Sequence, residues 1–279
     1  MTAILLALGS SIAYGLTDFL GGIAARRVHI FLLGSITQPL GLVALLLIAP
    51  LVGGSVTSEV WIWGGISGLG GVFAYVMLFR ALAIGPMSVA SPISALVAVV
   101  LPVLAGVLFG ERLPLVGWVG IAVGMVAVFM VSQVHEDAPH PVSLRVILLS
   151  FGAGVFISIF LVALERAPDD SGLWPLVVVR IVTSTLLIFA VVASRQLARP
   201  TNDVLWLGGV STLLDVAATA MFMLATREGL LTVVAVITAL YPAATVLMAR
   251  IVLKEHLQGL QRWGLALAAV SVAVLASVA

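Results

Sequence analysis

Cysteine is absent from this sequence of 279 residues, and charged residues make up only 9% of it. The lack of cysteine excludes disulfides, thiolate metal sites and cysteine nucleophiles. A typical soluble domain carries about 25% charged residues. The scarcity of charge, with 62% hydrophobic residues and a mean hydropathy of +1.27, therefore excludes a soluble protein. A formal net charge of +1 leaves no basic face for a row of phosphates, so we expect no nucleic-acid partner.

Long apolar runs, separated by charges or turn residues, fill the chain. At about 20 residues per transmembrane helix, these runs predict ten helices, at residues 2–24, 30–52, 60–81, 86–109, 115–132, 143–164, 173–193, 204–226, 231–252 and 260–278. We therefore predict an all-α integral membrane protein. The first run has no basic segment and contains Asp18, so we interpret it as a retained helix rather than a signal peptide.

The two halves of the sequence resemble each other at a constant offset of 144 residues. This offset takes Gly85 to Gly229, Ser94 to Thr238, Glu111 to Glu255, Gly120 to Gly264 and Gly124 to Ala268. We predict a first five-helix repeat at 1–132, a polar linker at 133–142 and a second five-helix repeat at 143–279. Because five is odd, the second repeat would cross the membrane in the opposite direction, an arrangement typical of secondary transporters.

The segment around the fourth and fifth runs has a distinctive pattern. A small-residue turn and a proline open the fourth run, prolines lie within it, Gly110-Glu111-Arg112 ends it, and a glycine-rich run follows. The second half repeats this pattern more loosely and ends in Lys254 and Glu255. The pattern resembles the ten-helix EamA-type members of the drug/metabolite transporter superfamily, although Tyr14 stands where that family often has tryptophan.

The resemblance implies a secondary transporter that exports small organic metabolites, amino-acid-like solutes or drugs. It also implies a binding site between the two repeats, lined by helices one, three, four, six, eight and nine. Relatives are commonly drawn with cytoplasmic termini. The positive-inside rule predicts the opposite orientation, because three Lys and Arg residues flank the spans on the face of the termini and nine on the other. Both orientations stay open at this point.

Three ionisable residues fall within the predicted spans: Asp18, Arg180 and Asp215. Each costs about 2.5–3.5 kcal/mol at the centre of a membrane helix, so each is a candidate functional residue. Asp215 lies near the middle of its helix, and Arg180 is about 5 Å from that depth at 1.5 Å per residue, so the two can pair. The alternatives are a structural ion pair and a site that contacts substrate or a proton. For Asp18 the alternatives are the cavity and an interfacial cap near Arg26.

Polar and proline residues inside the spans give further candidates. The sequence has three tyrosines, Tyr14, Tyr75 and Tyr241, and all lie within spans, as does Gln38. We predict that these four line the binding cavity, with satisfied contacts between helices as the alternative. Pro92, Pro102 and Pro242 each leave a backbone carbonyl without its helical partner. We predict a gating or hinge role for these prolines, with packing kinks as the alternative.

Small residues suggest close packing rather than catalysis. The pairs Gly120 with Gly124 and Gly264 with Ala268 predict contacts between helices of the chain, with a dimer face as the alternative. Gly-Ile-Ser-Gly at 65–68 resembles the nucleophile motif of intramembrane serine proteases. That chemistry needs a base, and all four histidines lie in loops or at span ends, so we predict no enzyme.

The sequence favours a secondary transporter that works by alternating access around a central cavity. Asp215 and Arg180 would recognise a charged or zwitterionic solute, or Asp215 would carry a proton. The alternatives are an uncoupled facilitator and a membrane scaffold with a structural Arg–Asp pair. We expect a small-molecule substrate, the lipid bilayer and protons as partners, no cofactor or metal, and a monomer or weak homodimer. We expect a multi-pass protein of the cell membrane, located in the bacterial inner membrane.

Overall fold

The computed structural model describes residues 1–131, 143–196, 199–253 and 259–278. Within these ranges the chain forms α-helices and one short 3-10 turn, and no strand. The predicted linker at 133–142 and Glu255 lie outside the described residues.

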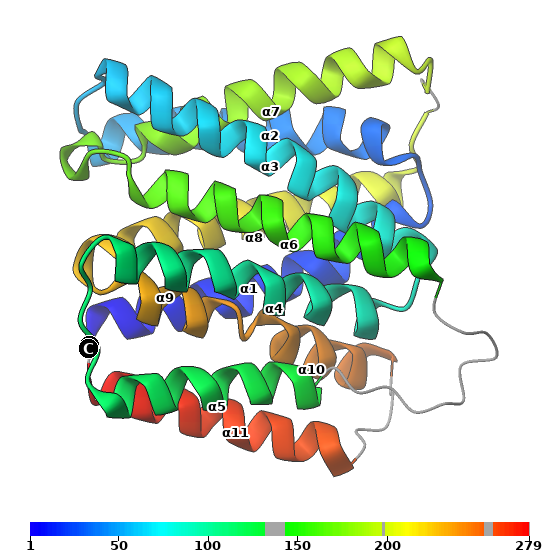
Figure 1. Cartoon of the computed structure of the whole chain (residues 1–279). Coiled ribbons are helices and arrows are strands. Elements are labelled where there is room, and N and C mark those ends of the chain that lie inside the picture. Colours follow the sequence, from blue (N-terminus) through cyan, green and yellow to red (C-terminus); the bar gives the residue numbers. More distant parts are fainter. Residues whose placement is uncertain (132–142, 197–198, 254–258, 279) are drawn as a thin grey trace.

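The helices form one elongated bundle, in which most axes run along the same direction (Figure 1). The loops that follow α1, α2 and α3 lie at alternating ends of the bundle (Figure 1). The elements are α1 (Thr2–Ala25), α2 (Ile30–Val52), α3 (Ser58–Ile84), α4 (Met87–Leu108), α5 (Leu115–Val131), α6 (Leu144–Glu165), the 3-10 turn η1 (Asp169–Ser171), α7 (Trp174–Ala193), α8 (Asn202–Glu228), α9 (Leu231–Thr238), α10 (Tyr241–Leu253) and α11 (Gly259–Ala276).

The ten predicted apolar helices are present in the described residues. Nine helical segments there are long and apolar enough to cross a membrane, and the shorter α5 is the tenth. The ninth segment is broken: α9 ends at Thr238 and α10 begins at Tyr241. Pro242 lies at the break and contributes to it, because proline has no backbone N–H to continue the helical hydrogen bonds. The predicted all-α membrane architecture is therefore confirmed, with one helix divided in two.

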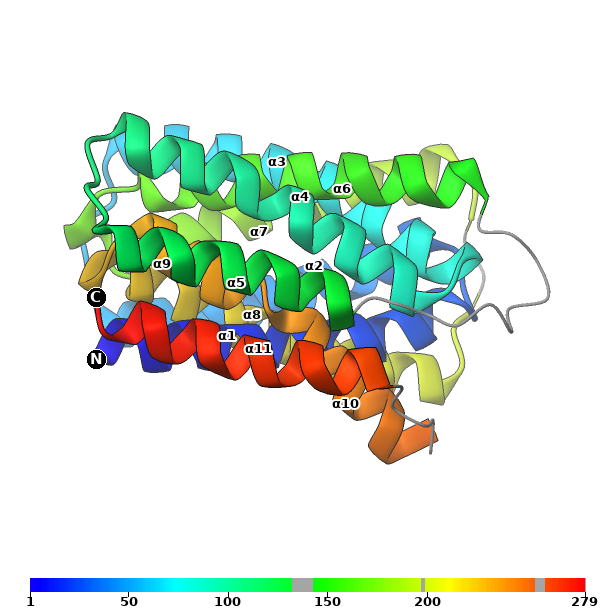
Figure 2. The same cartoon turned by 60° about the horizontal axis from the view of Figure 1, so that its bottom comes forward.

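Both chain termini lie at the same end of the bundle (Figure 2). We call this the terminal end, and the other the opposite end. The loop after α2 meets η1 at the terminal end, where Ser55 N donates to Asp170 O at 3.0 Å. The start of α9 is also at the terminal end, whereas the start of α2 and the start of α8 are at the opposite end (Figure 1).

Small residues bring α5 and α11 together, at the edge of the bundle (Figure 1). The Ser271 hydroxyl of α11 donates to the carbonyl of Gly120 at 2.8 Å. A side chain at Gly124 would collide with Ser271, and one at Gly264 would collide with Val131. The predicted small-residue pairs therefore pack helices of the same chain against each other.

Gly15 lets α1 approach the break between α9 and α10. A Cβ atom there would lie 2.5 Å from the Tyr241 carbonyl oxygen and 2.6 Å from the Ala244 side chain. The Thr245 hydroxyl also donates to the carbonyl of Gly15, at 3.1 Å. The broken segment is therefore held against α1 by backbone contact.

Glu111 connects the end of α4 to the start of α9. Its carboxylate accepts hydrogen bonds from the backbone N–H of Leu231 at 2.6 Å and of Thr232 at 3.0 Å, and from the Thr232 hydroxyl. The first N–H groups of a helix have no partner within the helix, so a carboxylate is well suited to cap them. Gly106 leaves room for this contact, because its Cβ would overlap the Glu111 carboxylate and the Thr232 hydroxyl.

Gly15→Ala should lower the free energy of unfolding by about 1–3 kcal/mol, because the added methyl group overpacks the contact with α10. Gly65→Ala is the matched control, since a Cβ at this helical glycine meets nothing within 4 Å. Thermal unfolding in detergent, followed by tryptophan fluorescence, measures both. Equal melting temperatures for the two variants would contradict the close approach.

Glu111→Gln should destabilise the protein by about 1–3 kcal/mol, because the amide keeps one acceptor oxygen and loses the charge that caps α9. Glu59→Gln makes the same change in the first turn of α3, where the side chain is exposed. The same thermal unfolding assay compares them. A loss of stability no larger than that of Glu59→Gln would show that the hydrogen bonds of Glu111 contribute nothing beyond the helix dipole.

Candidate functional site

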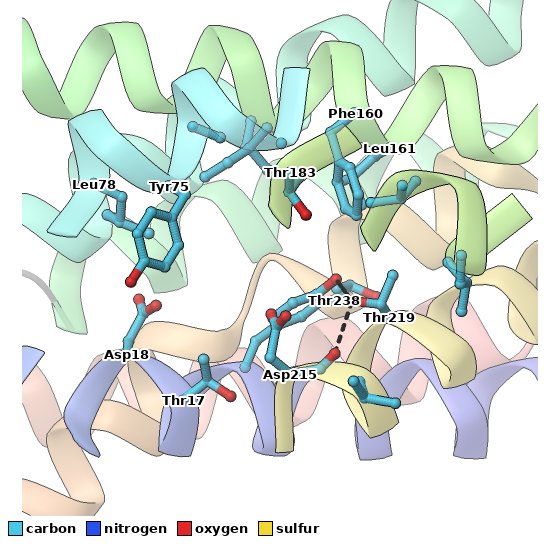
Figure 3. Close-up of a pocket in the computed structure, with 18 of the residues that line it drawn as sticks. Thr17, Asp18, Tyr75, Leu78, Phe160, Leu161, Thr183, Asp215, Thr219 and Thr238 are labelled. Atoms are coloured by element: carbon cyan, nitrogen blue, oxygen red, sulfur yellow. Dashed lines mark hydrogen bonds between the residues drawn. The ribbon is translucent and has the colours of Figure 1, made fainter. Parts of the chain in front are cut away.

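A cavity of about 130 Å³ lies among the helices, with Asp215 of the middle of α8 in its wall (Figure 3). Its lining comes from α1, α2, α3, α4, α6, α7, α8, α9 and the start of α10. The lining implied by the family resemblance left out the second and seventh helices. That expectation was too narrow, because Gln38 and Leu45 of α2 and Arg180 of α7 also face the cavity.

The structure brings all seven predicted substrate-binding residues to this one cavity. They are Tyr14 and Asp18 of α1, Gln38 of α2, Tyr75 of α3, Arg180 of α7, Asp215 of α8 and Tyr241 of α10. Pro92, Pro102 and Pro242 are not part of the described lining. The binding role of the seven residues stays a prediction, but the first requirement for it, a shared cavity, is met.

Arg180, which is buried, and Asp215, which is half-buried, form an ion pair, and Gln38 also bonds to the guanidinium. The guanidinium donates one hydrogen bond to the Asp215 carboxylate and another to the side-chain oxygen of Gln38. Thr183 donates to the same Gln38 oxygen at 3.1 Å. Arg180 is only 5% exposed. The cluster joins α2, α7 and α8, and the Arg180 guanidinium donates to an acceptor on each of the other two helices.

Close packing at Gly41 makes room for this cluster. A Cβ atom at Gly41 would lie 3.2 Å from Arg180 Nε and 3.1 Å from the Thr212 side chain. Any larger residue would press on the guanidinium, so this turn of α2 sets the position of Arg180 as well as supplying Gln38.

A second, smaller cavity of about 40 Å³ lies towards the opposite end. Gly21, Leu33 and Gly208 line it, whereas Leu45 and Leu176 extend the larger cavity towards the terminal end. The two cavities share the residues Thr17, Gln38, Tyr75, Phe79 and Asp215. The two cavities therefore adjoin each other at these five residues.

Asp18 lies in the cavity rather than at the interface. Its side chain is 4% exposed and accepts a hydrogen bond from the Ser91 hydroxyl at 2.9 Å. Arg26, the expected alternative partner, instead donates to the carbonyls of Leu82 and Gly85, at 3.1 Å each. The sequence left two alternatives open for Asp18, the cavity and an interfacial cap near Arg26. In the structure Asp18 lies in the cavity.

Hydroxyl groups connect the tyrosines of the cavity to neighbouring helices. Tyr241 shares a hydrogen bond with Ser94 of α4 at 3.0 Å. Tyr14 shares one with Thr219 at 3.0 Å, and Thr219 donates to the carbonyl of Asp215 at 2.8 Å. Thr219 was not among the predicted residues. Its position one helical turn after Asp215 is the sequence signal that could have identified it.

Polar groups near two of the prolines have different surroundings. Pro102 lies within α4, and the carbonyl that it frees, at Ala98, accepts a hydrogen bond from Ser158 of α6 at 3.1 Å. At the break before Pro242, the Thr238 hydroxyl is buried, lines the cavity and has no hydrogen-bond partner in the described structure. The hinge role of the three prolines stays a prediction.

Comparison with protein families identifies the kind of protein. The family model described as the EamA-like transporter family matches residues 1–133 and 144–277. The chain belongs to this family. It is therefore a multi-pass membrane protein and, in coarse terms, a membrane transporter of the drug/metabolite superfamily.

A solved structure entitled "Crystal structure of protein" is similar in fold. It is 19% identical, has a TM-score of 0.77, and the match covers 98% of this chain and 95% of that chain. At this identity the likeness concerns the fold alone. A search of curated proteins found no match.

Members of the EamA-like family are transporters rather than enzymes. The local structure at the Gly-Ile-Ser-Gly motif agrees with a packing role. The Ser67 hydroxyl is fully buried and donates to the carbonyl of Phe160 at 2.9 Å. Side chains at Gly64 and Gly68 would collide with Val178 and Val182 of α7. This motif therefore joins α3 to α6 and α7.

Proposed function

We propose that the protein exports small organic solutes by alternating access, with the central cavity as the binding site. One observation carries this proposal: the cavity that contains the Arg180–Asp215 pair is bordered towards the opposite end by a smaller cavity that shares five of its lining residues. Gln38, Tyr75 and Asp215 take part in the walls of both. Movement of these shared side chains would change which end of the bundle a solute in the larger cavity can reach. This is the property expected of a transporter site near the middle of the membrane.

The Arg180–Asp215 pair supplies a means of coupling that movement to a proton. A proton on Asp215 would remove the negative charge that pairs with the Arg180 guanidinium. Arg180 of α7 bonds to Asp215 of α8 and to Gln38 of α2, so this change would affect the contacts among three helices. Breaking a buried ion pair is costly because the remaining charge has no solvent to replace its partner. Protonation would therefore favour a rearrangement of these three helices.

Two alternatives make different predictions. An uncoupled facilitator would use the same cavity and would equilibrate its solute without regard to a proton gradient. A membrane scaffold would keep the pair for structure alone. The second alternative has support in the structure, because both Asp215 and Gln38 already satisfy Arg180.

Flux into proteoliposomes of the purified protein tests the function. Labelled amino acids and amphiphilic amines should accumulate when a pH gradient is imposed. Asp215→Asn should lower the initial rate about tenfold or more, or remove its dependence on the gradient, because the hydrogen bond from Arg180 then no longer joins two opposite charges. The asparagine oxygen still accepts from Arg180, so the variant should remain folded. Asp203→Asn, at an exposed carboxylate, is the control.

Flux that ignores the gradient would favour the facilitator. No flux for any compound would contradict the transporter proposal. Wild-type rates for Asp215→Asn would overturn the role of this carboxylate.

Exchanging the charges distinguishes a transport site from a structural pair. Asp215→Arg alone should lower the free energy of unfolding by about 3–5 kcal/mol, because it places a second cation beside Arg180. Arg180→Asp combined with Asp215→Arg should regain much of that stability but carry solute at least tenfold more slowly. Thermal unfolding and proteoliposome flux measure the two effects. Full recovery of flux in the double variant would identify the pair as structural.

A further inference from the structure

We propose that Asp18 binds the protonated amino group of an organic cation with an apolar body. The inference rests on the proposed transport function and names the class of its substrate.

The charges of the cavity are unbalanced. Among the described residues, three charged side chains line it, and these are Asp18, Arg180 and Asp215. Arg180 is paired with Asp215, and the described residues hold no cation within ion-pair distance of Asp18. The cavity therefore has one uncompensated carboxylate. An isolated charge inside a membrane protein is strongly destabilising, and a bound cation would compensate it.

Asp18 is positioned as a binding group. One carboxylate oxygen accepts from the Ser91 hydroxyl, and that is its one hydrogen bond in the described structure. The Ser91 backbone is held in turn, because its carbonyl accepts from Ser94 at 2.7 Å and from Tyr241 at 3.3 Å. In Figure 3 the carboxylate rises from α1 into the cavity, towards Tyr75. A carboxylate fixed in this way on one oxygen leaves the other for a ligand.

The wall around Asp18 suits an organic cation better than a metal ion. Tyr14, Tyr75 and Tyr241 are aromatic, and aromatic rings attract organic ammonium groups. The buried Thr238 hydroxyl adds an unpaired polar group to the same cavity. Hard metal ions instead require about six or more oxygen ligands, and Ser91 uses its hydrogen to donate to Asp18.

The remaining lining indicates the rest of the ligand. Towards the terminal end the wall is apolar, with Leu45, Leu161, Leu176 and Val179. The charge of Arg180 is already paired with Asp215, so a substrate carboxylate would compete with that carboxylate for the guanidinium. The cavity should therefore prefer an amine with an apolar body over the corresponding zwitterion or anion.

Four small molecules of similar size test this selectivity: 2-phenylethylamine, 2-phenylethanol, phenylalanine and 3-phenylpropionate. Calorimetric titration of the purified full-length protein measures their binding. The amine should bind at least tenfold more tightly than the other three, because one charged hydrogen bond is worth about this factor. Equal affinities for the amine and the alcohol in the wild type would overturn the proposal, and would be the result if Asp18 held its own proton.

Asp18→Asn should weaken binding of the amine at least tenfold and leave the weak binding of the alcohol unchanged. Asp203→Asn, which changes an exposed carboxylate of α8, should bind the amine like the wild type. Unchanged amine affinity in Asp18→Asn would overturn the proposal. If that variant fails to fold, Asp18→Glu takes its place. Asp18→Glu keeps the charge and should keep the preference for the amine over the alcohol. Loss of that preference in a folded Asp18→Glu variant would overturn a site based on charge.

The flux assay separates this inference from the proposed function. Transport of phenylalanine without binding of 2-phenylethylamine would leave the transporter standing and overturn the role of Asp18. Binding of the amine without flux of any solute would support Asp18 as a cation site and contradict the transport function.

Discussion

The structure depends on one constraint: inside a membrane, polar groups have no water and must find their partners within the protein. Helices satisfy most of the backbone. Serine and threonine hydroxyls join the helices by donating to carbonyls of their neighbours, as Ser10 does to Ala218, Ser158 to Ala98 and Ser271 to Gly120. Each such bond requires the two backbones to lie close together. Glycines at the contacts make this approach possible, and the polar bonds and the close packing therefore occur at the same places.

The same constraint gives the ionisable residues of the cavity their different roles. Arg180 and Asp215 neutralise each other, and Gln38 accepts a second hydrogen bond from the guanidinium. Asp18 has only a serine, although it is as deeply buried as Arg180. A satisfied pair is suited to hold helices until a proton or a solute disturbs it. A carboxylate with an incomplete set of partners is suited to receive a cation. One cavity thus contains a group that controls the contact between helices and a group that can bind.

The two halves of the broken helix, α9 and α10, are held in place by different contacts. At the terminal end, α9 is fixed by the Glu111 carboxylate. In the interior, its helical hydrogen bonds stop near Thr238, and α10 starts again against Gly15 of α1. By contrast, α4 contains two prolines and stays continuous, and Ser158 takes up the carbonyl that Pro102 frees. The helix α2 also stays continuous through Pro39 and Pro50. Proline alone therefore does not decide whether a membrane helix breaks.

The sequence by itself determined the ten apolar segments, the all-helical class and the short list of polar residues inside the spans, because lipid imposes these properties residue by residue. The sequence also predicted contacts between helices at the small-residue pairs of α5 and α11, since close approach of two backbones needs glycine, alanine or serine. Only the tertiary structure decided that Asp18 meets Ser91 rather than Arg26, that Gln38 bonds to the guanidinium of the Arg180–Asp215 pair, and that Glu111 caps α9. These contacts depend on how each helix is rotated about its axis. Helices that are apolar on all sides carry too little polar asymmetry for the sequence to fix that rotation.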